Sequence, residues 1–222
     1  MYNPTIFRED DSAASRRLID EFPFATIVSQ GPAGLWASQL PFLLYPTEGK
    51  QGILRAHFAR ANPHWRELAD TEQCIVIFQG AHGYVSPSWY PSKPITEKVV
   101  PTWNYATVHV WGKPTVVEDP AWLRQLVGDQ TDRQEQRRPQ PWAIGDAPAD
   151  FIALQLKAIV GIEIPIARLE GKRKLSQNRN AEDFQGVVAG LRASGDPHEN
   201  QPLAASMKLV AEEPDVSRSD PA

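Results

Sequence analysis

Twenty prolines and fourteen glycines punctuate the 222-residue chain, and their spacing limits the length of any regular element. Proline removes a backbone donor and glycine admits turn conformations, so the chain is cut into short segments that suit strands and turns better than long helices. About six strands result, without the regular strand and helix alternation that builds a parallel sheet. We therefore expect a mainly β protein, with a mostly antiparallel sheet, closed or nearly closed, and peripheral helices.

The predicted elements of the first half are short. Residues 12–22 favour a helix, because they are rich in Ala, Arg and Leu and follow two aspartates that can cap it. Residues 24–29 and 35–45 flank the turn Gly31-Pro-Ala-Gly34, which predicts a hairpin. The other predicted elements are strands over 52–59, 73–80 and 82–86 and a helix over 63–70, followed by an irregular segment over 87–101.

The second half contains one long predicted strand, over residues 103–118, whose alternation assigns its side chains to two faces. One face takes Trp103, Tyr105, Thr107, His109 and Trp111, and the other takes Asn104, Ala106, Val108 and Val110. Further predicted elements are helices over 119–133, 149–156 and 180–191, a loop over 139–148, and a strand over 157–169 with Val160, Ile162, Ile164 and Ile166 facing a core. The composition after residue 194 predicts a mobile tail over 194–222, so residues 1–193 are expected to form the domain.

Charge and composition exclude several classes of function. A formal net charge of −4 argues against the broad positive field that unaided DNA or RNA binding requires. No apolar run approaches a membrane span and the N-terminus lacks the basic and apolar parts of a signal peptide, so we expect a cytoplasmic protein without membrane contact. Cys74 is the only cysteine and lies in an apolar run, which excludes an intrachain disulfide and indicates a small buried residue.

The stretch over residues 53–62, ILRAHFARAN, is the strongest local candidate for a binding site. It reads as a strand that ends in His57, Arg60 and Asn62 and leads into the predicted helix over 63–70. A basic side chain and an amide beside exposed helix N–H groups suit a phosphate. Asn-Pro is also a common helix start, with Asn as the cap and Pro at the first helical position, so this corner alone leaves both interpretations open.

Four segments, taken together and in this order, resemble one protein family. They are Trp36-Ala-Ser-Gln-Leu-Pro41, Ala56-His-Phe-Ala-Arg-Ala-Asn-Pro-His-Trp65, Tyr84-Val-Ser-Pro-Ser-Trp-Tyr-Pro-Ser-Lys93 with Val100-Pro-Thr-Trp-Asn-Tyr105, and Lys174-Leu-Ser-Gln-Asn-Arg179. The resemblance is to the PaiB-type negative transcriptional regulators, an FMN-binding split-barrel family, and it covers roughly residues 1–191. It implies a six-stranded antiparallel split β-barrel, a homodimer, and an FMN site at the dimer interface.

The resemblance also implies which residues hold FMN. The strand end and loop before the first barrel helix would hold the phosphate, with Arg60 as the charged donor and Asn62 as a neutral one, and the flavin ring would lie along residues 37–40. Ser38 and Gln39 depart from the Thr-His pair associated with this position, which puts their side-chain contacts in doubt. The full implied set is Ala37, Ser38, Gln39, Leu40, His57, Ala59, Arg60, Asn62, Trp103, Asn104, Tyr105, Lys174, Ser176, Gln177 and Arg179.

Simpler explanations remain open for many of these residues, and no catalytic residue is assigned. The aromatic residues Trp89, Tyr90, Trp103, Tyr105 and Trp111 suit core or interface anchors as well as cofactor contacts. The basic residues 172–174 with Arg179 are commonly a solvated edge. The histidines lack a metal-ligand spacing, so no metal site is expected.

Three functional classes follow. The first is an FMN-binding regulator, in which a ligand or the redox state alters partner binding. The second is a flavin-dependent oxidoreductase acting on a small molecule, with His57 or Tyr105 as a testable proton donor, and the third is a haem-binding or haem-degrading split barrel. The acidic balance and the lack of a helix-turn-helix with a basic face make direct DNA binding doubtful, so regulation is expected to be indirect.

Overall fold

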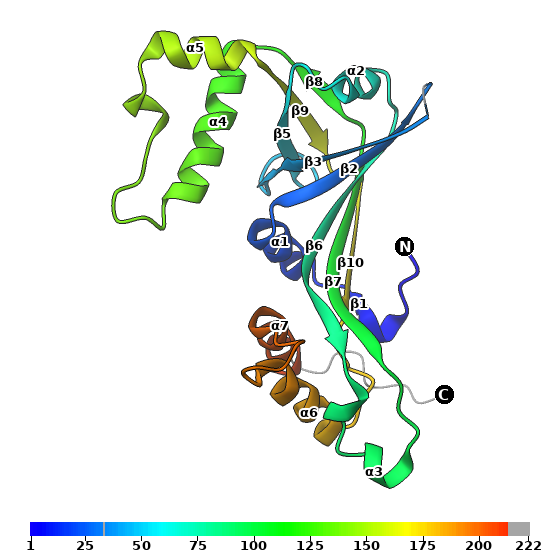
Figure 1. Ribbon diagram of the computed structural model, residues 1–222. Coiled ribbons are helices and arrows are strands. Elements are labelled where there is room, and N and C mark those ends of the chain that lie inside the picture. The colour runs from blue at the N-terminus through cyan, green and yellow to red at the C-terminus, as the bar shows by residue number, and fades with distance from the viewer. Residues whose placement is uncertain (33, 213–222) are drawn as a thin grey trace. The chain divides into compact units, whose positions relative to one another are not determined.

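The computed structural model of the protein describes residues 1–32 and 34–212 (Figure 1). Their strands are β1 (Arg8–Glu9), β2 (Phe24–Gly31), β3 (Gly34–Pro41), β4 (Leu43–Tyr45), β5 (Ile53–Ala59), β6 (Cys74–Val85), β7 (Thr102–Gly112), β8 (Thr115–Val117), β9 (Ile159–Pro165) and β10 (Arg168–Lys174). Their α-helices are α1 (Ser12–Glu21), α2 (His64–Ala69), α3 (Lys93–Thr96), α4 (Pro120–Glu135), α5 (Ala149–Lys157), α6 (Ala181–Arg192) and α7 (Gln201–Glu212), with 3-10 turns η1 (Thr5–Phe7), η2 (Pro87–Trp89) and η3 (Ile144–Asp146). None of these helices is long and apolar enough to cross a bilayer.

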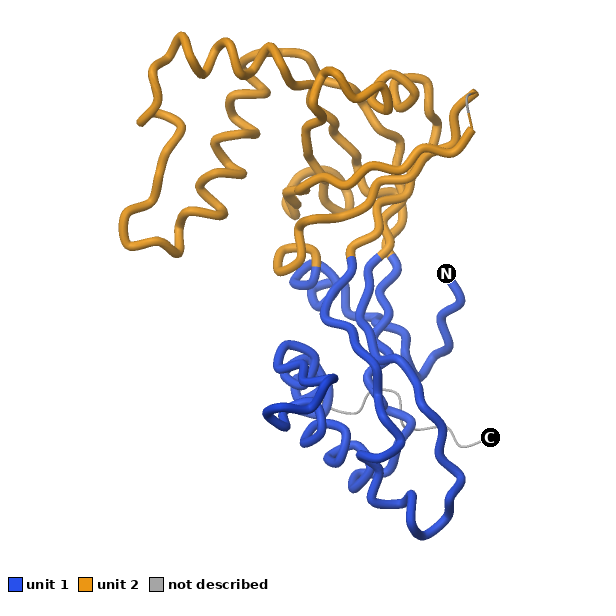
Figure 2. The backbone as a smooth tube through the Cα atoms, in the orientation of Figure 1, with its two compact units in different colours: residues 1–18, 79–108, 170–222 blue, residues 19–78, 109–169 orange. Residues whose placement is uncertain are grey.

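The chain divides into two compact units, coloured separately in Figure 2. Unit 1 comprises residues 1–18, 79–108 and 170–222, and unit 2 comprises residues 19–78 and 109–169. Strands β6 and β7 each contribute residues to both units. All strand pairings given for the chain are antiparallel, so the predicted class of antiparallel β with peripheral helices is confirmed.

Unit 2 is built on two antiparallel ladders. In the first, β3 lies at the edge and pairs with β2 along its whole length, while β2 also pairs with β6. In the second, four strands follow the order β4-β5-β9-β8. Alternate side chains of β5 and β9 are buried, because successive residues of a strand face opposite sides. They are Leu54, Ala56, Phe58, Val160, Ile162 and Ile164, all at most 1% exposed.

Helices α4 and α5 form a satellite of unit 2 with its own small core. Asp119 caps α4, as predicted, by accepting a hydrogen bond from the backbone N–H of Trp122 (2.8 Å). Leu123 from α4 packs with Ile152 and Leu156 from α5. This apolar cluster holds the two helices together.

Unit 1 contains part of the larger sheet, in the order β1-β10-β7-β6, together with α6 and α7. Helix α6 packs against η2 through two glycines. A Cβ on Gly186 would lie 2.2 Å from the carbonyl oxygen of Trp89, and one on Gly190 would lie 2.3 Å from its indole. The absence of both side chains therefore allows the close approach of Trp89 to the helix.

Several sequence predictions are confirmed at the level of single residues. Helix α1, strand β2 and the short α2 lie within two residues of their expected bounds, and β2 and β3 form the predicted hairpin. On β7, Asn104, Ala106, Val108 and Val110 are buried, whereas Trp103 on the opposite face is 50% exposed. Cys74 is 2% exposed, as expected for a small buried residue, and burial raises the pKa of its thiol to about 12.

The strand predictions were wrong in four places. One continuous strand, β6, occupies the region where two strands were expected, and the predicted strand over 35–45 divides into β3 and β4 after Pro41, which has no N–H to donate. The strand over 103–118 breaks at Pro114 for the same reason. The strand over 157–169 ends at Pro165, and β10 follows it although its sequence RLEGKRK lacks an apolar alternation.

The region after residue 194 also differs from its prediction. Residues 201–212 form α7 rather than a mobile tail, and Leu203, Ala204 and Met207 are buried on one side of it. The apolar residues of α7 recur at helical spacing, a signal that the surrounding Pro, Glu and Ser residues hid. Residues 213–222 of the predicted tail and Ala33 of the predicted turn lie outside the described residues.

Candidate functional site

A closed ring of hydrogen bonds joins Ser38 on β3 to Asn62 and His64 at the start of α2. Asn62 Nδ2 donates to Ser38 Oγ (3.2 Å), and the backbone N–H of His64 donates to Asn62 Oδ1 (3.0 Å). His64 Nδ1 completes the ring by bonding Ser38 Oγ at 2.8 Å. The bond from the His64 N–H is the one a helix cap makes, so the capping interpretation of Asn62 has structural support.

His64 is the most enclosed polar side chain of this group. It is 0% exposed, stacks on Trp36 with 5.8 Å between ring centroids, and meets Phe58 edge-on at 5.5 Å. Its Nε2 bonds Ser29 Oγ at 3.0 Å, so both ring nitrogens have hydroxyl partners. Burial lowers the pKa of His64, because the charged imidazolium is poorly solvated there. A neutral ring therefore fixes the Ser38 hydroxyl and, through it, the Asn62 amide.

Arg60, the predicted charged donor to the phosphate, is engaged within the chain. Its Nη1 donates to the Glu118 carboxylate at 2.5 Å, while Nε and Nη2 donate to the carbonyl oxygens of Lys157 (2.9 Å) and Ile159 (3.0 Å). The backbone N–H of Arg60 donates to the carbonyl oxygen of Ala158 (2.7 Å). These contacts tie the end of β5 to the α5–β9 connection, so binding a phosphate would require Arg60 to release them.

His57 and Phe58 lie on opposite faces of β5. Phe58 points into the core and contacts His64, whereas His57 lines a cavity beside α4. Ala59 is exposed at the end of the strand. The structure thus brings Ser38, Asn62 and His64 together but separates His57 from them.

The four predicted ring contacts lie on β3, an edge strand. Ala37 and Gln39 are exposed on one face, while Leu40 is buried and Ser38 half-buried on the other. Because β3 pairs only with β2, half of its backbone N–H and C=O groups lack a strand partner. Such groups provide both donors and acceptors for the polar edge of a flat ligand.

A second group of predicted residues lies in unit 1, around Lys174. Its Nζ donates to Thr102 Oγ1 (2.6 Å) and to the carbonyl oxygen of Trp103 (2.7 Å). The pKa of Lys174 is lowered mainly by burial and to a smaller extent by the positive charges of Lys172 and Arg179. No carboxylate among the described residues pairs with Lys174 or Arg179, so this cation cluster lacks a counter-ion there.

The loop that follows β10 is held by hydrogen bonds from three predicted residues, Asn104, Ser176 and Gln177. Asn104 Nδ2 donates to Ser176 Oγ (2.9 Å) and contacts Met207 Sδ (3.6 Å), and Ser176 has a positive φ of 67°. Gln177 accepts from the backbone N–H of Leu175 (2.7 Å) and donates to the carbonyl oxygen of Arg173 (2.5 Å). These three side chains are used to shape the loop, which sets the positions of its charged neighbours.

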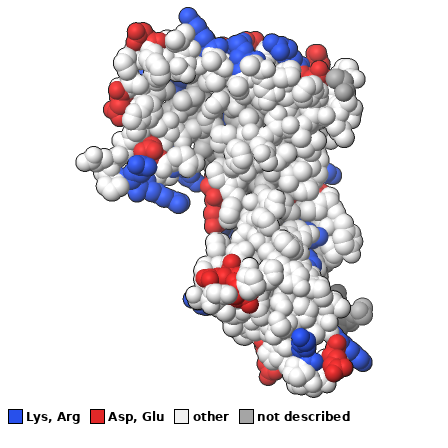
Figure 3. Space-filling view, in the orientation of Figure 1, with Lys and Arg blue, Asp and Glu red and all other residues white. Residues whose placement is uncertain are grey.

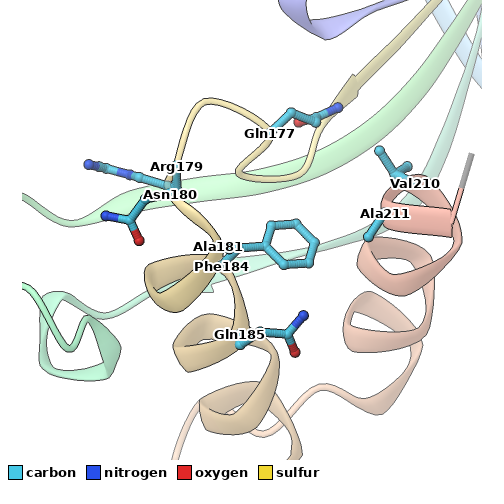
Figure 4. A pocket seen from close by; sticks show the side chains of 8 residues that line it. All are labelled: Gln177, Arg179, Asn180, Ala181, Phe184, Gln185, Val210 and Ala211. Carbon is cyan, nitrogen blue, oxygen red and sulfur yellow. The ribbon is translucent and has the colours of Figure 1, made fainter. Parts of the chain in front are cut away.

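Arg179 and Tyr90 lie together at the end of this loop. The guanidinium is 4.7 Å from the centre of the Tyr90 ring, and the buried Tyr90 hydroxyl has no hydrogen-bond partner among the described residues. A cavity of about 400 Å³ follows, and Figure 4 shows the Phe184 ring and Gln185 facing it from α6 and Val210 and Ala211 from α7. In the same view the Arg179 side chain extends away from Phe184, and the lining combines polar residues such as Gln177 and Asn180 with apolar ones.

Aromatic side chains cover the face of β6 and β7 beside Lys174. The Trp103 indole stacks on His82 (6.3 Å between centroids) and meets Tyr84 edge-on (6.4 Å). Lys172 is only 6% exposed and lies 5.3 Å from the Tyr105 ring. This face therefore combines an exposed aromatic surface with ammonium groups, which suits a planar anionic molecule.

Comparison with known proteins decides the family. The sequence profile of a family described as "Putative FMN-binding domain" matches residues 1–168. The chain belongs to this family, of the PaiB type. A relative from Bacillus subtilis (strain 168), "Protease synthase and sporulation protein PAI 2", is 31% identical over 201 residues, which cover 90% of this chain and 94% of that protein. An uncharacterized protein from Aspergillus fumigatus is 35% identical over 202 residues, covering 72% and 77%.

Solved structures support the fold of this PaiB-type chain. The flavocytochrome Anf3 from Azotobacter vinelandii superposes with a TM-score of 0.55 at 14% identity, covering 81% of this chain and 75% of that one. The FAD and heme binding protein from Mycobacterium smegmatis gives 0.55 at 18% identity, covering 82% and 80%. The fold is the expected FMN-binding split barrel, and these likenesses concern the fold alone.

Each unit of the PaiB-type chain offers donors of a kind that FMN needs. In unit 2, the unpaired edge of β3 offers backbone donors and acceptors, and in unit 1, Lys174 and Arg179 offer positive charge without a carboxylate partner among the described residues. Sequence reasoning missed His64 and Lys172 as members of these groups. His64 follows the Asn-Pro helix start and was visible only as a histidine without metal spacing, while nothing in the sequence marks Lys172 as buried.

Residues 1–32 and 34–212 contain no group of three His, Cys, Asp or Glu side chains that could hold a metal ion. On the face shown in Figure 3, basic side chains are interspersed with acidic ones and separated by uncharged surface. That face lacks the continuous basic patch typical of a nucleic-acid interface.

Proposed function

We propose that the protein is a homodimeric FMN-binding regulator, in which the ligand or redox state of the flavin alters binding to a partner. Membership of the family supports the cofactor, and the positive charge of Lys174 and Arg179 in unit 1 suits its phosphate. FMN would supply the redox chemistry, while the residues of this chain bind and orient it.

The observation that carries this proposal is the unpaired cation cluster of Lys172, Lys174 and Arg179. Burial and then the like charges of Lys172 and Arg179 lower the pKa of Lys174, and a doubly charged phosphate would relieve the repulsion between these charges. Arg60 is already bonded to Glu118 and two carbonyl oxygens. We therefore propose Lys174 and Arg179 as the principal phosphate ligands, with Arg60 maintaining the corner.

The proposed dimer draws on β3 in unit 2. Its residues Leu35 to Leu40 carry no charge, and Leu35 is 76% exposed, which is unusual for an edge strand left in water. A second copy of the chain would cover this edge, and an interface site would shield the flavin ring. Light scattering on the purified protein should give twice the mass of one chain.

Regulation is proposed to be indirect. The net charge of −4 and the interspersed charges in Figure 3 disfavour direct contact with DNA. A gel shift at low salt should therefore show no sequence-specific complex. A specific complex that weakens steeply with salt would replace this part of the proposal with direct repression.

The experiment that tests the cofactor is an FMN titration of the full chain followed by a visible spectrum after desalting. Flavin bands should survive, and Lys174→Met should weaken FMN by about tenfold or more, since a charge-assisted phosphate contact is lost. Lys113→Met, which removes a surface lysine paired with Glu72, serves as the control and should leave the affinity unchanged. A colourless protein, or equal affinity for Lys174→Met and wild type, would overturn the assignment.

A further inference from the structure

A cavity of about 420 Å³ lies in unit 2 between β5 and α4, apart from the residues proposed to hold FMN. His57 contributes from the strand, α4 contributes Gln130, Thr131, Gln134 and Glu135, and Trp142 closes one side. A cavity of this volume can take a small organic molecule. Its lining contains one formal charge, the carboxylate of Glu135.

His57 lines this cavity from β5. Its Nδ1 is buried and has no hydrogen-bond partner among the described residues, so this nitrogen is not reached from the open cavity. Burial lowers the pKa of His57, and the nearby Gln130 side chain partly opposes this shift. The ring therefore adds no positive charge to the lining.

Two polar side chains of the lining, Thr131 and Gln130, have donors that are already used. The Thr131 hydroxyl donates to the carbonyl oxygen of Val127 (2.7 Å), and Gln130 Nε2 donates to that of Pro41 (2.9 Å). Glu135 Oε2 accepts from the backbone N–H of Trp142 (3.1 Å) and pairs with Arg138 (3.3 Å). Glu135 Oε1 has no such partner among the described residues, so it remains available.

Trp142 adds to the cavity an aromatic side chain that the rest of the chain leaves partly exposed. Its side chain lines the cavity and is 44% exposed, and its backbone N–H is held by Glu135. An indole face attracts a cation that lies against it. The Arg138 guanidinium, which is not part of the lining, pairs with Oε2 of Glu135 (3.3 Å).

We propose that this cavity binds a small organic cation rich in N–H donors, such as an amine or an amidine. Its N–H groups would donate to Glu135 Oε1, and its charge or flat face would lie against Trp142. The proposal requires neither bound FMN nor Lys174, Arg179 and β3, so it can fail or succeed independently of the proposed function.

The test is a calorimetric titration of the full-length protein with benzamidine and with benzamide, its neutral near-isostere. Benzamidine should bind at least about tenfold more tightly, because benzamide lacks the charge that Glu135 would pair. Glu135→Gln should remove that difference. Glu72→Gln, which alters an exposed carboxylate paired with Lys113, should leave it intact.

Nitrogen–proton NMR spectra of the wild-type protein locate the binding site, so this measurement does not depend on the binding of a variant that could fail to fold. The indole N–H signal of Trp142, identified by its loss in Trp142→Phe, should shift with benzamidine in the wild-type protein. Equal binding of the two ligands, or a saturating benzamidine titration that leaves the Trp142 signal unmoved, would overturn the proposal.

Discussion

The Arg60 guanidinium donates to the Glu118 carboxylate with 2.5 Å between Nη1 and Oε2, across 58 positions of the chain. The same side chain reaches two backbone carbonyl oxygens near the start of β9. The exposed ion pair contributes little by itself, but the carbonyl bonds fix the end of β5 to a neighbouring segment.

Arg60→Met should lower the free energy of unfolding by about 1–2 kcal/mol, because it removes these hydrogen bonds. Urea unfolding of the purified protein measures this change. Arg66→Met is the matched control, since Arg66 lies at the same corner and contacts only the Trp65 ring (4.7 Å) among the described residues. A loss for Arg66→Met as large as that for Arg60→Met would contradict the structural role of Arg60.

His64 should make the stability depend on pH. Its folded-state pKa is lowered by burial, so the unfolded chain binds a proton more readily, and stability falls as the pH drops below about 6.5. His64→Gln should flatten this loss while lowering stability at neutral pH by about 1–3 kcal/mol, since the bonds to Ser29 and Ser38 change.

The measurement for His64 is urea unfolding at pH 7.5 and at pH 5.5 for both proteins. His57, whose pKa is also lowered by burial, contributes in the same direction, so the comparison includes His57→Gln. The prediction fails if the wild type and His64→Gln lose equal stability between the two pH values.

Two helix glycines should respond to alanine in opposite directions. Gly186→Ala in α6 would place a Cβ 2.2 Å from the carbonyl oxygen of Trp89, so we expect a loss of about 1–3 kcal/mol despite the better helix propensity of alanine. In α4, a Cβ on Gly128 would meet nothing closer than 4.0 Å, so Gly128→Ala should gain about 0.5–1 kcal/mol. Thermal unfolding of the two variants decides, and a stabilised Gly186→Ala would refute the packing of η2 on α6.

Asp183 should be sensitive to loss of its charge, because its buried carboxylate accepts several hydrogen bonds. The carboxylate is 4% exposed and accepts from the backbone N–H (3.1 Å) and hydroxyl (2.8 Å) of Ser92. Asp183→Asn should cost about 1–3 kcal/mol, because an amide replaces one acceptor with a donor. Glu182→Gln at the exposed neighbouring position should change the melting temperature little. Equal losses of melting temperature in the two variants would contradict the proposed role of Asp183 in holding Ser92.

Sequence patterns predicted the parts of this fold that depend on periodicity. Leu54, Phe58 and Ile162 follow a period of two, so their burial was predictable from spacing alone. β10 could not be found this way, since a charged strand next to β7 is stabilised by its neighbours and not by its own composition.

The candidate site was less predictable than the fold, because its chemistry depends on distant partners. Arg60 meets Glu118, and Ser38 meets Asn62 and His64, through tertiary contacts that no local pattern encodes. His57 and Phe58 are neighbours in sequence, yet strand alternation sends them to different environments. Local chemistry identified useful donors, but the tertiary structure determines which of them remain unused.

The uncharged edge of β3 has a consequence for handling the protein. If the partner chain no longer covers residues 35–40, this edge strand is free to pair with strands of other molecules. Mutations that disrupt the proposed dimer should therefore cause the protein to precipitate instead of yielding a soluble monomer. A lysine introduced at the exposed position of Gln39 would act as a gatekeeper against such growth. The solubility of the protein and its self-association would therefore both depend on residues 35–40.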